Sequence, residues 1–352
     1  MTPTFAELTT MRVGGPTADF ARATSTDQVL DVVRRADSAG RPVLVMSGGS
    51  NLVVSDQGWD GITVQVASNG IDISGTTVRA DAGADWDVLV AETLAQGLAG
   101  LEPLSGIPGS VGGTPVQNVG AFGTVTSDVL RSVTVYDRRS GAVSEWPPER
   151  CGFGSHRQSA FKHTDRYVVL SVAYELRRST RSVPLTFAEL VRRLGIEPGA
   201  TADTSDVRRV VLQLRRERGS IYDPDDNDTW GVGSFFINPV LAAVPEQARE
   251  SPTYPDVNGT KLPAGWLIQH AGFAPGYGRD WGRGSVALSS KHALAVTNKG
   301  DATTAEVMAF AAHIRDGVQA RFGIRLGPEC DLIRCSLDDA PSGRQPSAVP
   351  VP

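Results

Sequence analysis

The sequence predicts a protein of mixed helices and strands, divided into two or three domains, without a Rossmann nucleotide-binding unit. Its 352 residues exceed the roughly 100–200 residues of a single typical domain. Segments with helical and with strand periodicity both occur along the chain. The glycine-rich stretch SGGSN at 47–51 is followed by the strand-like run LVV, whereas a Rossmann unit continues from its glycine turn into a helix.

The first predicted helix covers residues 25–40. Ser25 and Gln28 have capping-box spacing, and Gly40 ends the pattern. Its apolar face consists of Val29, Val32, Val33 and Ala36. Short apolar or alternating runs predict strands at 43–46, 52–54, 61–66, 76–83, 132–146 (a hairpin that turns at 138–141) and 167–177.

Further helices are predicted over 86–97, 205–218 and 304–322. The second is amphipathic, with Val207, Val210, Val211 and Leu214 facing inward. The stretch 223–231, DPDDNDTWG, has the composition of a linker, and a smaller α/β unit is expected after it, with a strand near 324–326. The tail, residues 336–352, is expected to be disordered.

Composition excludes several classes of protein. The formal net charge of −5 provides no global field for nucleic acid or an anionic membrane, so neither is an expected partner. The N-terminus lacks the features of a signal peptide, and no apolar run is long enough to span a membrane. Three scattered cysteines are too few for a disulfide framework or a zinc site. We therefore expect a reduced, cytoplasmic protein without a structural metal.

Two glycine-rich segments carry the first chemical signals. In SGGSN, the glycines allow several backbone N–H groups to converge on a phosphate, although a tight hairpin turn has the same pattern. Residues 103–123 contain six Gly, three Pro and no charged side chain. Loops of this length are usually functional, although a purely structural loop remains open. Gln117 and Asn118 could orient the polar edge of a ligand there.

Three other segments contain candidate reactive groups. Arg157 could hold a carboxylate with two hydrogen bonds, and neighbouring His156 could titrate near neutral pH. Ser234 precedes two phenylalanines in GVGSFFINP, where a dry environment would suit proton donation. Glu329, in RLGPEC, could polarise a substrate if it is desolvated. Taken singly, such residues more often form a surface ion pair (Arg157), a loop or core hydrogen bond (His156), a turn cap (Ser234) or an exposed loop carboxylate (Glu329).

Taken together and in this order, the segments resemble the UDP-N-acetylenolpyruvoylglucosamine reductase family, in its subgroup with a longer inserted loop. The resemblance runs from TTMRVGGPTADF at 9–20 to RLGPECDLI at 325–333. Its most specific part is IPGSVGGTPVQNVGAFG, supported by GSFFINP and KLPAGWLIQHAGF. SGGSN alone is less specific, because the wider vanillyl-alcohol-oxidase-like flavin domains share it.

The resemblance implies an α+β fold, in which two FAD-binding subdomains precede a smaller substrate-binding domain. The implied boundaries are 1–70, 71–222 with the inserted loop, 223–335, and the tail 336–352. The implied site residues fall into three groups. The expected FAD-binding residues are Ser47, Gly48, Gly49, Ser50, Asn51, Pro108, Gly109, Gly112, Gly113, Gln117, Asn118, Gly120 and Ala121. The expected catalytic residues are Arg157, Ser234 and Glu329, and the expected substrate-binding residues are His156, Arg218, Asn238 and Lys261.

The implied reaction consumes NADPH and uses FAD that is not covalently attached. NADPH passes a hydride to FAD, and C3 of UDP-N-acetylglucosamine enolpyruvate then receives it. Ser234 would protonate C2, while Arg157 and Glu329 would stabilise the enolate. The product, UDP-N-acetylmuramate, serves peptidoglycan synthesis and thereby cell-wall biogenesis, cell shape and division. A monomer is expected.

Three positions depart from the family pattern: His156 and Phe187 where Tyr is common, and Arg218 where Lys is common. All three fall where the family contacts substrate or pyrophosphate. Two alternatives stay open at this point. One is a paralogue that reduces another enol ether or unsaturated acid. The other is a flavin-binding protein that lost catalysis, against which the retention of Arg157, Ser234 and Glu329 argues.

Overall fold

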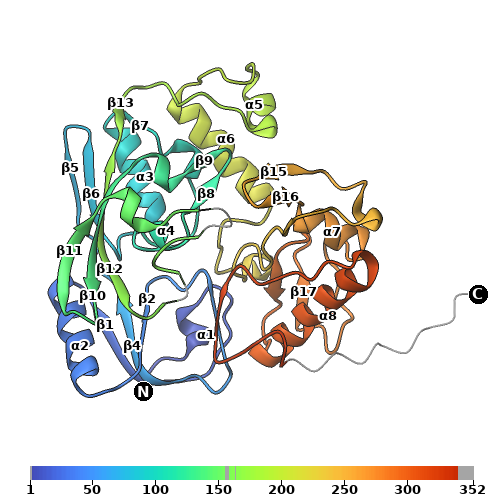
Figure 1. The fold of residues 1–352 in the computed structure, drawn as a ribbon, viewed down its shortest axis with the longest axis horizontal. Coiled ribbons are helices and arrows are strands. Elements are labelled where there is room, and N and C mark those ends of the chain that lie inside the picture. The colour runs from blue at the N-terminus through green and yellow to red at the C-terminus, as the bar shows by residue number, and fades with distance from the viewer. Residues whose placement is uncertain (1, 155–157, 163, 340–352) are drawn as a thin grey trace, which may run out of the picture. The chain divides into compact units, whose positions relative to one another are not determined.

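In the computed structural model, which describes residues 2–154, 158–162 and 164–339, the chain forms two units, each built from separate stretches (Figure 1). The sheet unit comprises Ala18–Gly48 and Asp60–Glu217. The terminal unit, which contains both chain ends, comprises Met1–Thr17, Gly49–Trp59 and Arg218–Pro352. The finer division at 1–70, 71–222 and 223–335 stays a prediction.

The sheet unit is built on a five-stranded antiparallel sheet with the order β11-β10-β12-β6-β5. Its strands are β5 (Ile71–Ser74), β6 (Thr77–Asp81), β10 (Leu130–Asp137), β11 (Ala142–Trp146) and β12 (Tyr167–Glu175). Hydrophobic residues of the central strands, among them Val133, Val135 and Val172, are completely buried. The predicted hairpin turns where expected, and Gly141 provides the positive φ of +70° in that turn.

A second, three-stranded sheet has the order β1-β4-β2. Its strands are β1 (Thr17–Ala23), β2 (Val43–Met46) and β4 (Trp59–Val66). Helix α2 (Thr26–Ser38) follows β1 and begins where the side chain of Ser25 accepts a hydrogen bond from the amide of Gln28 at 3.3 Å. Because Val29, Val33 and Ala36 are buried, the apolar face predicted for this helix is confirmed.

The remaining α-helices and strands of the sheet unit belong to the glycine-rich segment and the inserted loop or lie near them in sequence. They are α3 (Trp86–Ala95), β7 (Leu98–Ala99), α4 (Gly113–Val116), β8 (Gly120–Ala121), β9 (Thr124–Val125), β13 (Arg177–Arg178), α5 (Ala188–Leu194) and α6 (Thr204–Glu217). Helix α6 buries Val207, Val210, Val211 and Leu214, as its periodicity predicts. These side chains share a small core with Phe122 and Leu190.

The terminal unit is organised around the long helix α8 (Thr304–Phe322) and the hairpin of β17 (Val286–Leu288) and β18 (Val296–Asn298). Its other elements are α1 (Phe5–Leu8), β3 (Leu52–Val54), β14 (Val240–Leu241), β15 (Tyr254–Asp256), β16 (Gly259–Lys261), α7 (Ala264–His270) and β19 (Asp331–Ile333). Strands β3 and β19 pair in parallel, although they lie far apart in sequence. The carboxylate of Asp56 accepts hydrogen bonds from the amides of Thr304 and Ala305, and thereby fixes residues 49–59 to the start of α8.

One prediction of local structure is wrong. No strand forms at 324–326; Ile324 and Leu326 are buried there, and the next regular strand is β19. Gly323 ends α8 in the left-handed region, and Pro328, which has no N–H to donate, makes only a single bridge with Phe236. The stretch 223–231 contains a hydrogen-bonded 3₁₀ turn at Asn227–Thr229, and its role as a linker stays a prediction.

The expected tail falls mostly on 340–352, which lie outside the described residues. Before them, Leu337 is buried and its carbonyl accepts a hydrogen bond from Arg315 at 3.0 Å.

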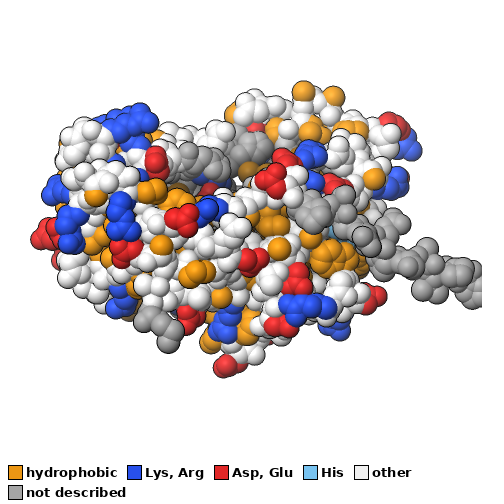
Figure 2. Space-filling view, turned by 90° about the horizontal axis from the view of Figure 1, so that it is seen from below, with side chains coloured by type: hydrophobic (Ala, Val, Ile, Leu, Met, Phe, Trp, Pro, Cys, Tyr) orange, Lys and Arg blue, Asp and Glu red, His pale blue; other side chains and the backbone are white. Residues whose placement is uncertain are grey.

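Acidic and basic side chains are mixed over the face drawn in Figure 2. The formal charge of −5 is therefore not gathered into one patch on that face. Within the part of the chain that the structure describes, none of the helices combines the length and apolarity needed to cross a membrane.

Candidate functional site

The SGGSN segment joins β2 to β3 and passes from the sheet unit to the terminal unit between Gly48 and Gly49. In the sheet unit, the hydroxyl of Ser47 donates to the carbonyl of Val66 at 3.0 Å. A Cβ placed on Gly48 would lie 3.7 Å from the α-carbon of Gly109, so these two backbones approach closely without an intervening side chain. Such bare backbone is suited to a ligand that is recognised by N–H groups.

In the terminal unit, Gly49 adopts a φ of +60°, and its carbonyl accepts a hydrogen bond from the amide of Thr10 at 3.3 Å. The side-chain nitrogen of Asn51 is buried and has no hydrogen-bond partner among the described residues. The carbonyl of Asn51 accepts from the amide of Asp331 at 2.9 Å, beside the β3–β19 pair. Ser50 is half-buried in the same segment.

The glycine-rich segment 107–123 is fixed to the end of β6 and the start of α3. The amide of Gly112 donates to the carbonyl of Ala82 at 2.8 Å, and the amide of Val111 donates to the carbonyl of Ala84 at 2.9 Å. A Cβ on Gly112 would lie 2.6 Å from the Cβ of Ala82, which explains why glycine is needed there. Gly109 adopts a φ of +120°, a conformation that favours glycine.

The second half of this segment contains the predicted polar residues. Helix α4 begins at Gly113 and ends before Gln117, whose buried Oε1 atom lacks a hydrogen-bond partner within the described part of the chain. Asn118 adopts a φ of +35°, and its side-chain oxygen accepts from the amide of Ser127 at 3.2 Å. Gly120 and Ala121 form β8 and pair with β9.

These observations fit a flavin dinucleotide. A buried acceptor without a partner, on Gln117, lies in the same segment as the bare backbone at Gly109, Gly112 and Gly113. Buried polar atoms are rarely left unsatisfied, so Oε1 of Gln117 is a candidate acceptor for a polar group of a ligand. The structure brings Gly48 and Gly109 together, and Pro108 lies beside Gly109 in sequence.

The candidate reactive residues of the terminal unit lie on two adjacent extended segments. Phe236 and Pro328 form an antiparallel bridge, and the amide of Glu329 donates to the carbonyl of Phe235 at 2.8 Å. Ser234, half-buried, precedes Phe235 in this segment. Phe235 and Phe236 are buried and contact each other edge to face, with ring centroids 5.2 Å apart. The fold therefore places Ser234 and Glu329 on neighbouring segments over an aromatic core.

Asn238 and Lys261 lie on two segments of the terminal unit that pair with each other. The side-chain oxygen of Asn238 accepts from the amide of Ala264 at 2.8 Å, at the start of α7. Lys261 ends β16 and is paired with Val240, two residues after Asn238. Asn238 is exposed and Lys261 half-buried, so both can be reached by a ligand.

Arg218 lies near a histidine that the sequence did not indicate. Burial, followed by the positive charge of Arg218, lowers the pKa of His292 below its ordinary value of 6.5. The Nδ1 atom of His292 accepts a hydrogen bond from the amide of Leu294 at 3.2 Å. A lone histidine has no sequence signature, so only the fold identifies this neighbour of Arg218.

Of the remaining predicted residues, Arg157 and His156 lie outside the described residues. Phe187, one of the departures from the family pattern, is exposed at the start of α5 and contacts Phe122 edge to face at 5.3 Å. Ser47, Gly48 and residues 108–121 belong to the sheet unit, whereas Arg218, Ser234, Asn238, Lys261 and Glu329 belong to the terminal unit.

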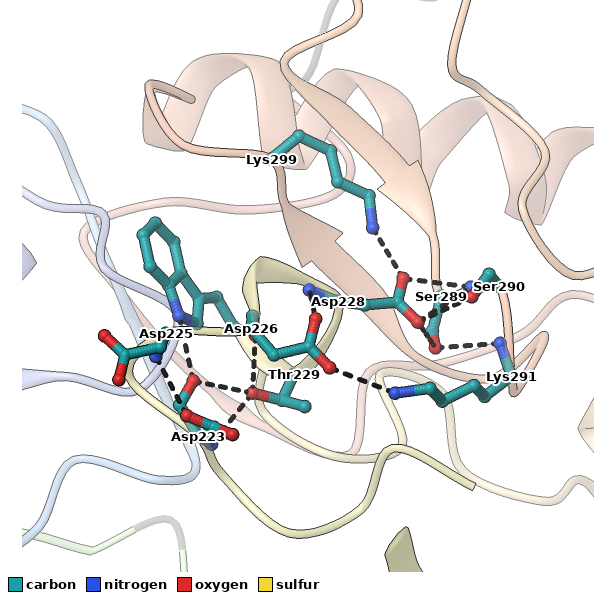
Figure 3. Close-up of polar contacts among 10 residues, drawn as sticks. Asp223, Asp225, Asp226, Asp228, Thr229, Ser289, Ser290, Lys291 and Lys299 are labelled. Carbon is teal, nitrogen blue, oxygen red and sulfur yellow. Dashed lines mark hydrogen bonds and ion pairs between the residues drawn. The ribbon is translucent and has the colours of Figure 1, made fainter. Parts of the chain in front are cut away.

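The sequence did not indicate the hydrogen-bonded turn at residues 223–229, which we call the acidic turn (Figure 3). Burial by itself would raise the pKa of Asp228, but hydrogen bonds from Lys299 and Ser290 hold this pKa below its ordinary value. Nearby, the exposed carboxylate of Asp226 pairs with Lys291 at 3.0 Å. The stretch interpreted as a linker therefore contains a buried ionic contact.

Two family models match separate parts of the chain. A family model described as an FAD binding domain matches residues 17–145. A second model, described as the C-terminal domain of UDP-N-acetylenolpyruvoylglucosamine reductase, matches residues 223–333.

Similar proteins cover nearly the whole chain. A UDP-N-acetylenolpyruvoylglucosamine reductase from Saccharopolyspora erythraea is 47% identical over 350 residues, covering 94% of this chain and 95% of the relative. One from Nocardia farcinica is 49% identical, covering 92% and 87%. The solved structure of UDP-N-acetylenolpyruvylglucosamine reductase from Thermus caldophilus is 24% identical, covers 94% of this chain and 97% of its own, and superposes with a TM-score of 0.64.

Proposed function

The chain belongs to the UDP-N-acetylenolpyruvoylglucosamine reductase family, and from this premise we propose that it reduces UDP-N-acetylglucosamine enolpyruvate to UDP-N-acetylmuramate with NADPH. The observation that carries the proposal is the pairing of the Ser234 and Glu329 segments in the part of the chain that matches the family's C-terminal domain. The product is a precursor of peptidoglycan, and we place the reaction in the cytoplasm. The alternative of another enol ether is not favoured by relatives that are 46–49% identical.

The sheet unit would hold the flavin. Backbone N–H groups around Ser47, Gly48 and Gly109 would bind the pyrophosphate, and Oε1 of Gln117 would accept a hydrogen bond from a polar edge of the cofactor. FAD, when bound, supplies the hydride that reaches C3 of the enolpyruvyl group. No His or Cys precedes Cys151 in the sequence, so we expect FAD to be held without a covalent bond.

Ser234 would deliver the proton to C2. Adding a hydride to an unsaturated acid places negative charge on the carboxylate side of the substrate, and C2 becomes strongly basic. A hydroxyl is a weak acid, so it donates only to such a basic centre and only from a fixed position. The buried rings of Phe235 and Phe236 would fix the backbone next to Ser234 and exclude water from beneath it.

Glu329 and Arg157 would stabilise the negative charge that develops. Glu329 is half-buried and follows Pro328, whose bridge with Phe236 fixes its backbone. Stabilising groups of this kind act mainly on the transition state. Asn238, Lys261, Arg218 and His156 would contact the substrate, which carries a diphosphate and a carboxylate.

Two measurements test this function. The purified protein should be yellow and should release FAD on denaturation. It should then oxidise NADPH only when UDP-N-acetylglucosamine enolpyruvate is added, with UDP-N-acetylmuramate as product. A colourless protein that does not bind added FAD, or a flavoprotein that does not turn over this substrate, would contradict the proposal. Size-exclusion chromatography should show a monomer.

A further inference from the structure

Asp228 holds the loop that connects β17 to β18. Its carboxylate accepts hydrogen bonds from the amide of Ser290 at 3.0 Å, from the hydroxyl of Ser290 at 2.8 Å and from the hydroxyl of Ser289 at 3.0 Å (Figure 3). The ammonium group of Lys299, just after β18, contacts the same carboxylate at 2.7 Å. The side chain of Asp228 is only 12% exposed. One carboxylate therefore fixes the beginning of this loop and the residue that follows the hairpin.

The far end of the same loop contacts the segment that contains Ser234. The carbonyl of Leu294 accepts a hydrogen bond from the amide of Phe235 at 2.8 Å. Within the loop, the amide of Ser289 donates to the carbonyl of Ala295 at 2.8 Å, so its two ends are tied together. The segment 228–235 is therefore hydrogen-bonded to the same loop at both of its ends, through Asp228 and through Phe235.

The stretch between these two contacts is also fixed. The amide of Asn298 donates to the carbonyl of Trp230 at 2.9 Å, which aligns residues after Asp228 with β18. A Cβ on Gly231 would lie 2.8 Å from the carbonyl oxygen of Val296, so the chain runs close along this strand. Ser234 thus follows a segment whose path is set by the hairpin and by Asp228.

We propose that Asp228 is a positioning residue for the proton donor: it holds the Ser289–Leu294 loop, and through the Leu294–Phe235 hydrogen bond it fixes Ser234 in place for proton transfer. The inference rests on the proposed function, because it concerns the step assigned to Ser234. Misplacement of a reacting group by about 1 Å can cost about 10²-fold in rate. Asp228 would therefore affect proton delivery more than the reduction of the flavin by NADPH.

The test compares Asp228→Asn with Asp225→Asn. Both changes replace a carboxylate of the acidic turn with an amide of the same shape. The Asp225 side chain, however, is exposed, and its carboxylate makes no hydrogen bond or ion pair with any described residue. We expect Asp228→Asn to slow reoxidation of the reduced flavin by the enolpyruvyl substrate about 10-fold or more, with flavin reduction and FAD content near wild type. Asp225→Asn should leave both steps within about twofold, as is usual for a surface substitution away from packed or hydrogen-bonded groups.

A double-mutant cycle separates positioning from general destabilisation. If Asp228 acts through Ser234, Asp228→Asn should cost little in a Ser234→Ala background. Amide hydrogen exchange gives a readout that does not depend on activity: in Asp228→Asn, exchange should accelerate at Phe235 as well as at Ser290. If Asp228→Asn is not obtained as folded protein, Ser290→Ala, which removes one hydroxyl donor, should slow the same step about two- to threefold.

Several outcomes would overturn the inference. They are wild-type reoxidation in Asp228→Asn, an equal loss in both half-reactions, full additivity with Ser234→Ala, and unchanged exchange at Phe235. A wild-type protein whose reduced flavin is not reoxidised by the enolpyruvyl substrate would instead contradict the proposed function, before any variant is compared.

Discussion

The backbone N–H of Glu329 donates a hydrogen bond to the carbonyl of Phe235 at 2.8 Å, while the N–H of Phe235 donates to the carbonyl of Leu294 at the same distance. The residue next to Ser234 is therefore held from both sides by backbone contacts. Side-chain substitutions at 234 and 329 leave these contacts intact, so they can test chemistry separately from folding.

Gly112→Ala should weaken flavin retention. The new Cβ would lie 2.6 Å from the Cβ of Ala82 and 2.9 Å from its carbonyl oxygen, and backbone cannot move away cheaply. Overpacking of this kind typically costs about 1–3 kcal/mol, here at the base of the segment that would bind FAD. The ratio of flavin to protein absorbance and the thermal midpoint should both fall.

Gly265→Ala is the control. A Cβ at position 265 would meet only the side chain of Leu294, at 3.4 Å, which is an ordinary van der Waals contact, and alanine favours the helix α7 in which it lies. If Gly265→Ala lost flavin as readily as Gly112→Ala, the loss would not come from the contact with Ala82.

Acid sensitivity should depend in part on Glu306. Hydrogen bonds from Arg283 lower the pKa of Glu306 from 4.5 to about 2. A carboxylate with a depressed native pKa stabilises the fold above its unfolded pKa, and this contribution is lost as pH falls through the native value. Wild-type protein should therefore lose this part of its stability between about pH 4.5 and 2. Chemical denaturation at a series of pH values should show a flatter profile for Glu306→Gln.

Glu246→Gln provides the comparison for this measurement. Glu246 pairs with Arg249 at the surface, where its side chain is 75% exposed, so the change should alter the profile little. A profile for Glu306→Gln that parallels wild type would show that the contact with Arg283 does not contribute to acid stability.

Sequence patterns predicted most of the regular structure because each pattern reflects a local physical cause. The buried face of α6 follows from its 3.6-residue period, and the β10–β11 hairpin follows from two alternating runs around a glycine turn. The strand expected at 324–326 was wrong because apolar residues can also be buried in an extended segment without a partner strand. Pro328, which has no N–H to donate, makes only a single bridge there.

The network around Asp228 could not be predicted from the sequence. Asp228 and Ser290 are separated by 62 positions, and neither has a periodic or spaced motif. Acidic residues next to Pro and Asn have the composition of a linker, and only tertiary contact shows that this carboxylate is buried. Ser234 and Glu329 were identified through their family motifs, but their adjacency depends on the pairing of distant segments.

Glu329→Gln should slow reoxidation of the flavin by the enolpyruvyl substrate by about 10²-fold, the loss typical of one group that stabilises developing charge. Flavin reduction by NADPH should change much less, because no enolate forms in that step. Stopped-flow absorbance of the flavin reports both steps in one protein, so the first serves as the internal control. Equal losses in the two steps would indicate a structural role for Glu329.

Ser234→Ala is the most direct test of the site. Removing a positioned general acid typically costs about 10²–10⁴-fold in rate. The loss should be confined to the second step, because reduction by NADPH requires no proton at C2. The variant should bind FAD and be bleached by NADPH at a near-normal rate, and the reduced flavin should then persist after the enolpyruvyl substrate is added. Ser38→Ala, whose hydroxyl only donates to the carbonyl of Arg34 in α2 at 2.8 Å, should behave as wild type. Wild-type reoxidation in Ser234→Ala would mean that the proton comes from another group, such as Glu329 or water, and that Ser234 serves only the turn after Gly233.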